Sequence, residues 1–210
     1  EIRKKGMGKI ARKSREWFPG ATYHIMERGI RRQIIYEEEG DYQAFLSILK
    51  SGIEKYGCVL HAYCLMTNHF HMLLETREIN ISKFMKYLAG CYALYFNKKY
   101  DYQGHLFEGR YKAMLVKDDA YFLQTSRYIH INPTKAGIVE QPEDYPWSSY
   151  RTIIGMNNDK ITQISRTYTY FKNNPVVHYR QFVEDMGRIY TMEDERIKRH
   201  IEEDDLWLPW

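Results

Sequence analysis

Residues 58–75 read CVLHAYCLMTNHFHMLLE and carry the strongest indication of the fold. This stretch holds two runs of strand-forming residues, 58–66 and 69–75, with only Thr67-Asn68 between them. Two residues suffice for a β-hairpin turn, whereas parallel strands need a crossover of a dozen residues or more. The stretch therefore predicts two neighbouring antiparallel strands.

The segments on either side of this hairpin extend the sheet and add helices. Apolar residues alternate over 21–28, as in a strand, and recur every three or four positions over 40–56, as in a helix that ends at Gly57. The same criteria predict a helix over 81–99, a strand over 110–117 and a helix over 119–131 that ends at Asn132-Pro133. The order of elements predicts an α+β protein with a ferredoxin-like split βαβ antiparallel sheet and helices packed on one face.

The chain divides into two parts near residue 155. A loop rich in proline and glycine follows residue 132, and two more helices are expected over 176–187 and 192–203. We expect residues 1–155 to form the main domain, with a basic N-terminal arm, and residues 156–210 to form a small helical extension.

Charge is distributed unevenly along the 210 residues, whose net charge is +4. Residues 1–32 contain ten Lys/Arg and three Asp/Glu, a net of +7, whereas residues 176–210 contain five and nine, a net of −4. A basic front end suits a polyanion such as nucleic acid, and it equally suits a solvated terminus. The acidic end does not suit nucleic acid.

Cysteine usage and hydropathy bear on the cellular compartment. The three cysteines, Cys58, Cys64 and Cys91, are an odd number without a CxxC pair, which argues against a disulfide framework or a zinc knuckle. The sequence contains no apolar run of the ~18 residues that a membrane span needs. We expect a cytoplasmic protein that does not enter a membrane.

The triplet His69-Phe70-His71 is a candidate metal site. Alternate residues of a strand point to the same face, so both imidazoles leave the sheet together while Phe70 enters the core. Two imidazoles on one face can bind one divalent metal ion. A lone HxH triplet is a weak signal, but here it interrupts an otherwise apolar strand.

Tyr128 and Asn132 lie four residues apart on the third predicted helix and at its end, so they share one of its faces. The amide oxygen of Asn132 could complete a metal shell begun by two histidines, and Tyr128 could then attack a phosphate bound to the metal. The same spacing also suits a packed tyrosine ring and a helix cap before Pro133. The spacing alone leaves both interpretations open.

Basic side chains of the N-terminal arm, of the loop after residue 28, of the strand predicted over 110–117 and beside Tyr128 are candidates for binding phosphates. Such residues are more often solvated surface charges, so each remains a candidate only. The set comprises Arg12, Lys13, Arg15, Arg31, Arg32, Arg110, Lys112 and Arg127.

Four stretches together resemble a known family. They are MTNHFH at 66–71, GHLFEGRYK at 104–112, RYIHINPTKAG at 127–137 and YPWSSY at 145–150. These motifs are similar to those of the single-tyrosine HUH transposases, and in particular to the branch of REP-associated tyrosine transposases. The resemblance covers about residues 15–155.

The resemblance implies a ferredoxin-like fold, hairpin DNA as partner and Mg²⁺ or Mn²⁺ as cofactor. It implies cleavage of single-stranded DNA through a 5′-phosphotyrosine on Tyr128, followed by strand transfer, in a monomer or a homodimer. His69 and His71 take the positions of metal ligands, and Asn132 takes that of the third ligand, where many relatives carry glutamine.

Two other functions remain open on the same residues. A domesticated protein could bind hairpin DNA without moving it, and a metal-dependent RNA nuclease could use the same fold without a covalent intermediate. The joint presence of His69, His71 and Tyr128 favours the DNA strand-transfer enzyme, because a pure binder does not need them.

Overall fold

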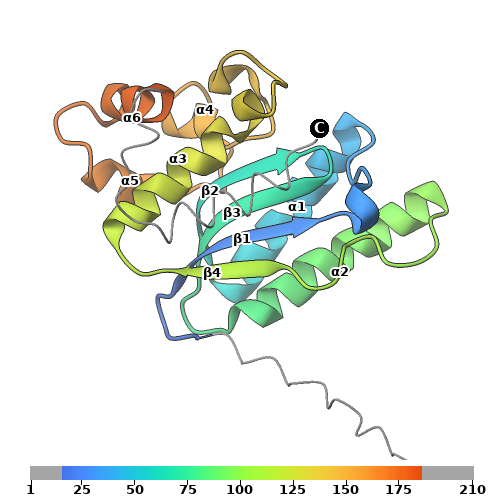
Figure 1. Ribbon diagram of the computed structural model, residues 1–210. Helices are drawn as coiled ribbons and strands as arrows, with labels where there is room; N and C mark the ends of the chain where they lie inside the picture. Colours follow the sequence, from blue (N-terminus) through green and yellow to red (C-terminus); the bar gives the residue numbers. More distant parts are fainter. Residues whose placement is uncertain (1–15, 186–210) are drawn as a thin grey trace, which may run out of the picture.

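The computed structural model describes residues 16–185 and has a four-stranded antiparallel sheet at its centre. The strands are β1 (Thr22–Arg28), β2 (Val59–Met66), β3 (His69–Glu75) and β4 (Lys112–Val116). They lie in the order β2-β3-β1-β4 (Figure 1). The predicted hairpin is thus present as β2 and β3, and the predicted fold class is confirmed.

Two helices cover one face of this sheet, α1 (Glu39–Tyr56) and α2 (Ile81–Tyr100) (Figure 1). Alternate strand residues point toward them and form the main core with them, as Ile25, Phe70 and Met72 do. Helix α1 ends where predicted, since Gly57 caps it in the left-handed conformation at φ 64°, which glycine adopts at little cost.

The further helix, α3 (Asp119–Lys135), lies across the opposite face, over β2 and β3. Phe122 and Ile129 pack there against Cys64 and Leu73. The helix was predicted to end before Pro133, but it continues to Lys135. Proline removes only one hydrogen bond so near the end, and the Ala136 amide still donates to the Asn132 carbonyl at 2.9 Å.

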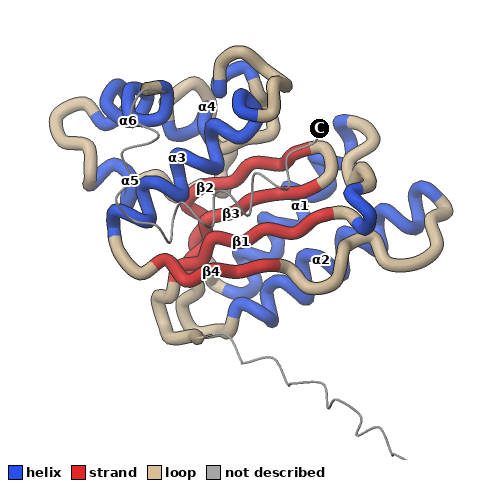
Figure 2. Tube along the Cα trace, viewed as in Figure 1, coloured by secondary structure: helices blue, strands red, loops and turns tan. Residues whose placement is uncertain are grey.

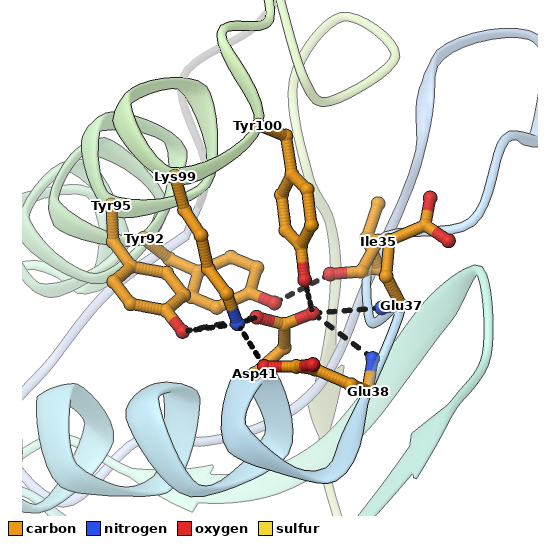
Figure 3. A network of polar contacts seen from close by, with 8 residues as sticks. All are labelled: Ile35, Glu37, Glu38, Asp41, Tyr92, Tyr95, Lys99 and Tyr100. Carbon is orange, nitrogen blue, oxygen red and sulfur yellow. Dashed lines mark hydrogen bonds and ion pairs between the residues drawn. The ribbon is translucent and has the colours of Figure 1, made fainter.

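A buried carboxylate joins the start of α1 to the end of α2. Asp41 is fully buried, and Figure 3 shows polar groups converging on it from α2 and from the residues just before α1. It accepts hydrogen bonds from two backbone amides, two phenols and one ammonium group, which belong to Glu37, Glu38, Tyr95, Tyr100 and Lys99. This network holds the loop that leads from β1 into α1.

At the end of the sheet where β1 ends and β3 begins, the loop after β1 meets the loop before β4 (Figure 2). Gly29 and Phe107 form an isolated antiparallel bridge there. The short helix η1 (Ile30–Arg32) belongs to the first of these loops. The sheet is therefore extended by two loops beside the first residues of β3.

The segment after α3 protects the outer edge of β2. The Leu65 amide donates to the Trp147 carbonyl at 2.9 Å, and the Gln163 amide donates to the Leu60 carbonyl at 2.7 Å. Such pairing covers an edge that would otherwise offer backbone groups to another chain. The elements of this region are η2 (Pro142–Asp144), α4 (Tyr150–Ile153), α5 (Ser165–Thr169) and α6 (Pro175–Glu184).

Helix α6 corresponds to the helix predicted over 176–187, whereas α5 was not predicted and the helix predicted over 192–203 lies outside the described residues. Residues 160–184 contact both α3 and the sheet. The division near residue 155 stays a prediction. Within residues 16–185, each helix is too short or too polar to cross a membrane.

Candidate active site

His69 and His71 lie at the beginning of β3, on the face of the sheet that α3 covers. Their side chains are each only 1% exposed, and their ring centroids are 4.9 Å apart. Phe70, between them, packs into the core on the other face. The period of two along a strand therefore places the two imidazoles side by side, as predicted.

Helix α3 brings Tyr128 to these histidines. The Tyr128 ring lies 5.6 Å from the ring of His71, centroid to centroid, and stands almost perpendicular to it. The side chain is 4% exposed, and the Lys135 ammonium lies 5.3 Å from the centre of its ring. The phenol of Tyr128 thus lies beside both the imidazole of His71 and the ammonium group of Lys135.

Asn132 follows one helical turn after Tyr128 and is fully buried. Its Nδ2 donates to the Tyr128 carbonyl at 3.2 Å, which fixes the orientation of the amide. Its Oδ1 and the Nε2 of His71 are buried without a hydrogen-bond partner among the described residues. Buried polar atoms normally have partners, so two such acceptors suit a bound cation.

Burial keeps both histidines neutral. Desolvation, reinforced by the positive charge of Arg28, lowers the pKa of His69 to about 3. Desolvation, with the neighbouring His69 and His24, lowers the pKa of His71 well below its ordinary value. A neutral imidazole is the form that binds a metal ion.

Residues 16–185 contain no group of three or more His, Cys, Asp and Glu side chains placed to hold a metal ion. The donor set that the residues offer is two imidazoles and one amide oxygen, which suits a divalent ion of the first transition row or Mg²⁺.

Sequence reasoning missed three residues around this site. His24 of β1 places its Nε2 3.2 Å from the Nδ1 of His71. Asn68 accepts at 2.6 Å from the Nδ1 of His69. Arg28 is the strand partner of His69 and forms an ion pair with Glu108 at 2.6 Å. The alternation of side chains over His24-Ile25-Met26, typical of a strand, was the one signal in the sequence that could have pointed to His24.

A second set of buried contacts fixes α3 on the sheet. His130 bonds the Tyr179 hydroxyl at 2.7 Å and the Ser149 hydroxyl at 2.8 Å, and Ser126 also bonds Tyr179, at 2.6 Å. Helix α6 and the start of α4 therefore hold the helix that carries Tyr128.

Arg127, which was predicted to bind DNA, belongs to this second set. Its side chain is 3% exposed, and its guanidinium donates to the carbonyls of Val183 and Asp185 and lies over the ring of Phe182. The structure contradicts the prediction at this position, because consecutive helical residues point in different directions and Tyr128 takes the sheet-facing one.

The other predicted DNA-binding residues are placed differently. Arg31 and Arg32 are exposed in η1, at φ 53° and 61°, and Arg110 is exposed before β4. Lys112 is half-buried at the start of β4. Arg12, Lys13 and Arg15 lie outside the described residues.

Comparison with known proteins identifies the family of this chain. The model of the family described as "Transposase IS200 like" matches residues 18–132, which is more than half of the chain. A protein of Haemophilus influenzae assigned to the REP-associated tyrosine transposases is 30% identical over 118 residues, and the match covers 50% of this chain and 66% of that relative.

The fold is also that of a solved REP-associated tyrosine transposase, which is bound to a REP hairpin in its structure. The two structures align with a TM-score of 0.61 and 16% identity, over 74% of this chain and 96% of the other. This similarity supports the fold, and the family model carries the assignment. The motif resemblance is thereby confirmed, and the chain belongs to the IS200-like transposases.

Proposed function

We propose that this protein cuts and rejoins single-stranded DNA beside a hairpin, with Tyr128 as the nucleophile. The observation that carries the proposal is the placement of the Tyr128 ring 5.6 Å from that of His71, whose Nε2 is buried without a partner among the described residues. A tyrosine beside a candidate metal ligand is the arrangement that nucleophilic attack on a phosphodiester needs.

His69, His71 and Asn132 would hold a divalent metal ion, Mg²⁺ or Mn²⁺. When bound, the ion polarises the scissile phosphate and offsets the charge that develops on it. The two neutral imidazoles and the buried Oδ1 of Asn132 supply the lone pairs for this ion. Burial of the set excludes water that would compete with the tyrosine.

The reaction exchanges one phosphodiester for another and needs no external energy source. The Tyr128 oxygen forms a bond to phosphorus and loses its proton, the bond from phosphorus to the 3′ oxygen breaks, and that oxygen takes up a proton. The product is a 5′-phosphotyrosine and a free 3′-hydroxyl. Attack by another 3′-hydroxyl reverses the step and joins a new strand.

The substrate proposal rests on charge and on the relatives. Arg28 and Lys135 place positive charge beside the histidines and Tyr128, and the turn at Arg31-Arg32 exposes two more guanidinium groups at the same end of the sheet. Such charges bind phosphates without reading bases. Because the imidazoles and the phenol come from one chain, one copy can supply a complete site.

The decisive experiment captures the covalent intermediate. We would mix the protein with Mn²⁺ and a labelled single strand that carries a hairpin from beside its own gene, and separate the products in SDS. We expect a protein–DNA band that is lost in Tyr128→Phe, while native hairpin affinity changes little because only one hydroxyl is removed.

Tyr121→Phe is the matched control, since Tyr121 lies seven residues earlier on the same helix. It should retain the covalent band. A band that persists in Tyr128→Phe would move the nucleophile elsewhere. Native binding of the hairpin without any covalent band would instead indicate a DNA-binding protein with a silent site.

A further inference from the structure

We infer that His24 and Asn68 are positioning residues that fix the tautomers of the two metal-binding histidines. Each would leave the hydrogen on Nδ1, so that each histidine presents the lone pair of Nε2 to the metal ion. The inference rests on the proposed function, because it takes His69 and His71 to be metal ligands.

Asn68 determines the tautomer of His69. The Asn68 Nδ2 donates to the Arg32 carbonyl at 3.2 Å, and this bond fixes which end of the amide faces the imidazole. Its Oδ1 therefore lies 2.6 Å from the Nδ1 of His69. An amide oxygen can only accept a hydrogen bond, so Nδ1 carries the hydrogen and Nε2 keeps its lone pair.

His24 has the same effect on His71. Its Nε2 lies 3.2 Å from the Nδ1 of His71, and the two rings stack with centroids 5.4 Å apart. In a neutral pair one nitrogen donates and the other accepts. A hydrogen on the Nε2 of His71 would be a buried donor with no acceptor among the described residues, whereas a lone pair there is what a metal ion uses.

Both contacts come from outside the HxH triplet, and both are buried, with His24 3% and Asn68 7% exposed. His24 reaches His71 from the neighbouring strand, and its ring also lies 5.9 Å from that of Tyr128. Asn68 ties His69 to the turn that carries Arg31 and Arg32. The two residues thus hold the ligands ready before the metal ion arrives.

The first test needs neither metal nor a variant. Nitrogen chemical shifts of the imidazoles, measured by NMR on the metal-free full chain, report which nitrogen carries the hydrogen. We expect the Nδ1–H tautomer for both His69 and His71. An Nε2–H tautomer at either histidine would overturn the inference.

The second test measures Mn²⁺ affinity by calorimetry. His24→Phe keeps an aromatic ring but removes the acceptor, and Asn68→Leu keeps the side-chain shape but removes both polar atoms. We expect each to weaken Mn²⁺ binding by about 10–100-fold, the usual effect of losing a residue that orients a ligand. Asn68→Asp, which keeps an acceptor for Nδ1, should restore the affinity.

His61→Gln is the matched control, because His61 is buried on β2 and bonds Glu75 instead of a candidate ligand. It should bind Mn²⁺ like the wild type. Wild-type affinity in both His24→Phe and Asn68→Leu would overturn the inference. A wild-type protein that binds no Mn²⁺ while showing the expected tautomers would contradict the proposed function. It would still agree with the inference that His24 and Asn68 fix the two tautomers.

Discussion

At the scale of single residues, several ionisable groups of the sheet are buried in their neutral form. His69 and His71 are two examples, and Glu27 of β1 is a third on the other face of the sheet, where it is the strand partner of Phe70. Glu27 is 5% exposed, its Oε2 has no hydrogen-bond partner among the described residues, and desolvation raises its pKa from 4.5 to about 8.

This carboxyl predicts a dependence of stability on pH. Between pH 4.5 and 8 the native state holds a proton that the unfolded chain has lost, so the stability that Glu27 contributes is complete below pH 4.5 and is lost as pH rises through about 8. We expect Glu27→Gln to be more stable than the wild type by about 2–4 kcal/mol at pH 9, and similar to it at pH 4.

Denaturant unfolding at the two pH values measures this difference. Glu54→Gln is the matched control, since Glu54 is exposed on α1 and the substitution removes the same charge. Equal changes in the free energy of unfolding for Glu27→Gln and Glu54→Gln at pH 9 would show that burial of Glu27 is not the cause.

At the scale of elements, the loop that supports His69 through Asn68 is held by the carboxylate of Asp41. Burial alone would raise the pKa of Asp41, but its hydrogen bonds from Lys99, Tyr100, the Glu37 amide and Tyr95 outweigh burial and lower it. Asp41 is therefore charged in the native state, and its donors would be left without an acceptor if it were removed.

We expect Asp41→Ala to reduce the free energy of unfolding by about 3–5 kcal/mol, because it strands a buried network of donors and one ammonium group. Glu39→Ala, in the same helical turn but exposed, should change it by no more than about 0.5 kcal/mol. Thermal and urea unfolding of both variants measures the difference. Similar small losses in both would mean that the network contributes little.

The elements themselves could be predicted from the sequence because their signals are local. Alternation placed the strands, and the period of two placed His69 and His71 on one face. The spacing of four placed Tyr128 and Asn132 together. The contacts of His24 with His71 and of Asn68 with Arg32 join residues 47 and 36 positions apart, so spacing could not reveal them.

At the scale of the whole molecule, helix α6 packs against α3 and holds the helix that carries Tyr128. Tyr179 of α6 bonds both Ser126 and His130, which lie on either side of Tyr128 along α3. The DNA-binding role predicted for Arg127 was wrong because its partners Val183 and Asp185 are more than fifty residues away, where sequence spacing could not reveal them. Only the packed chain shows that these residues anchor the helix that carries Tyr128.

Mass spectrometry of the captured adduct would identify the residue that forms the covalent bond to DNA, which we propose is Tyr128. Trypsin cleaves after Lys117, Arg127 and Lys135, so Tyr121 and Tyr128 fall in separate peptides, 118–127 and 128–135, with one tyrosine in each. After nuclease trimming, we expect the added mass of a 5′-phosphorylated nucleotide on peptide 128–135. Attachment to any other peptide would mean that Tyr128 is not the nucleophile.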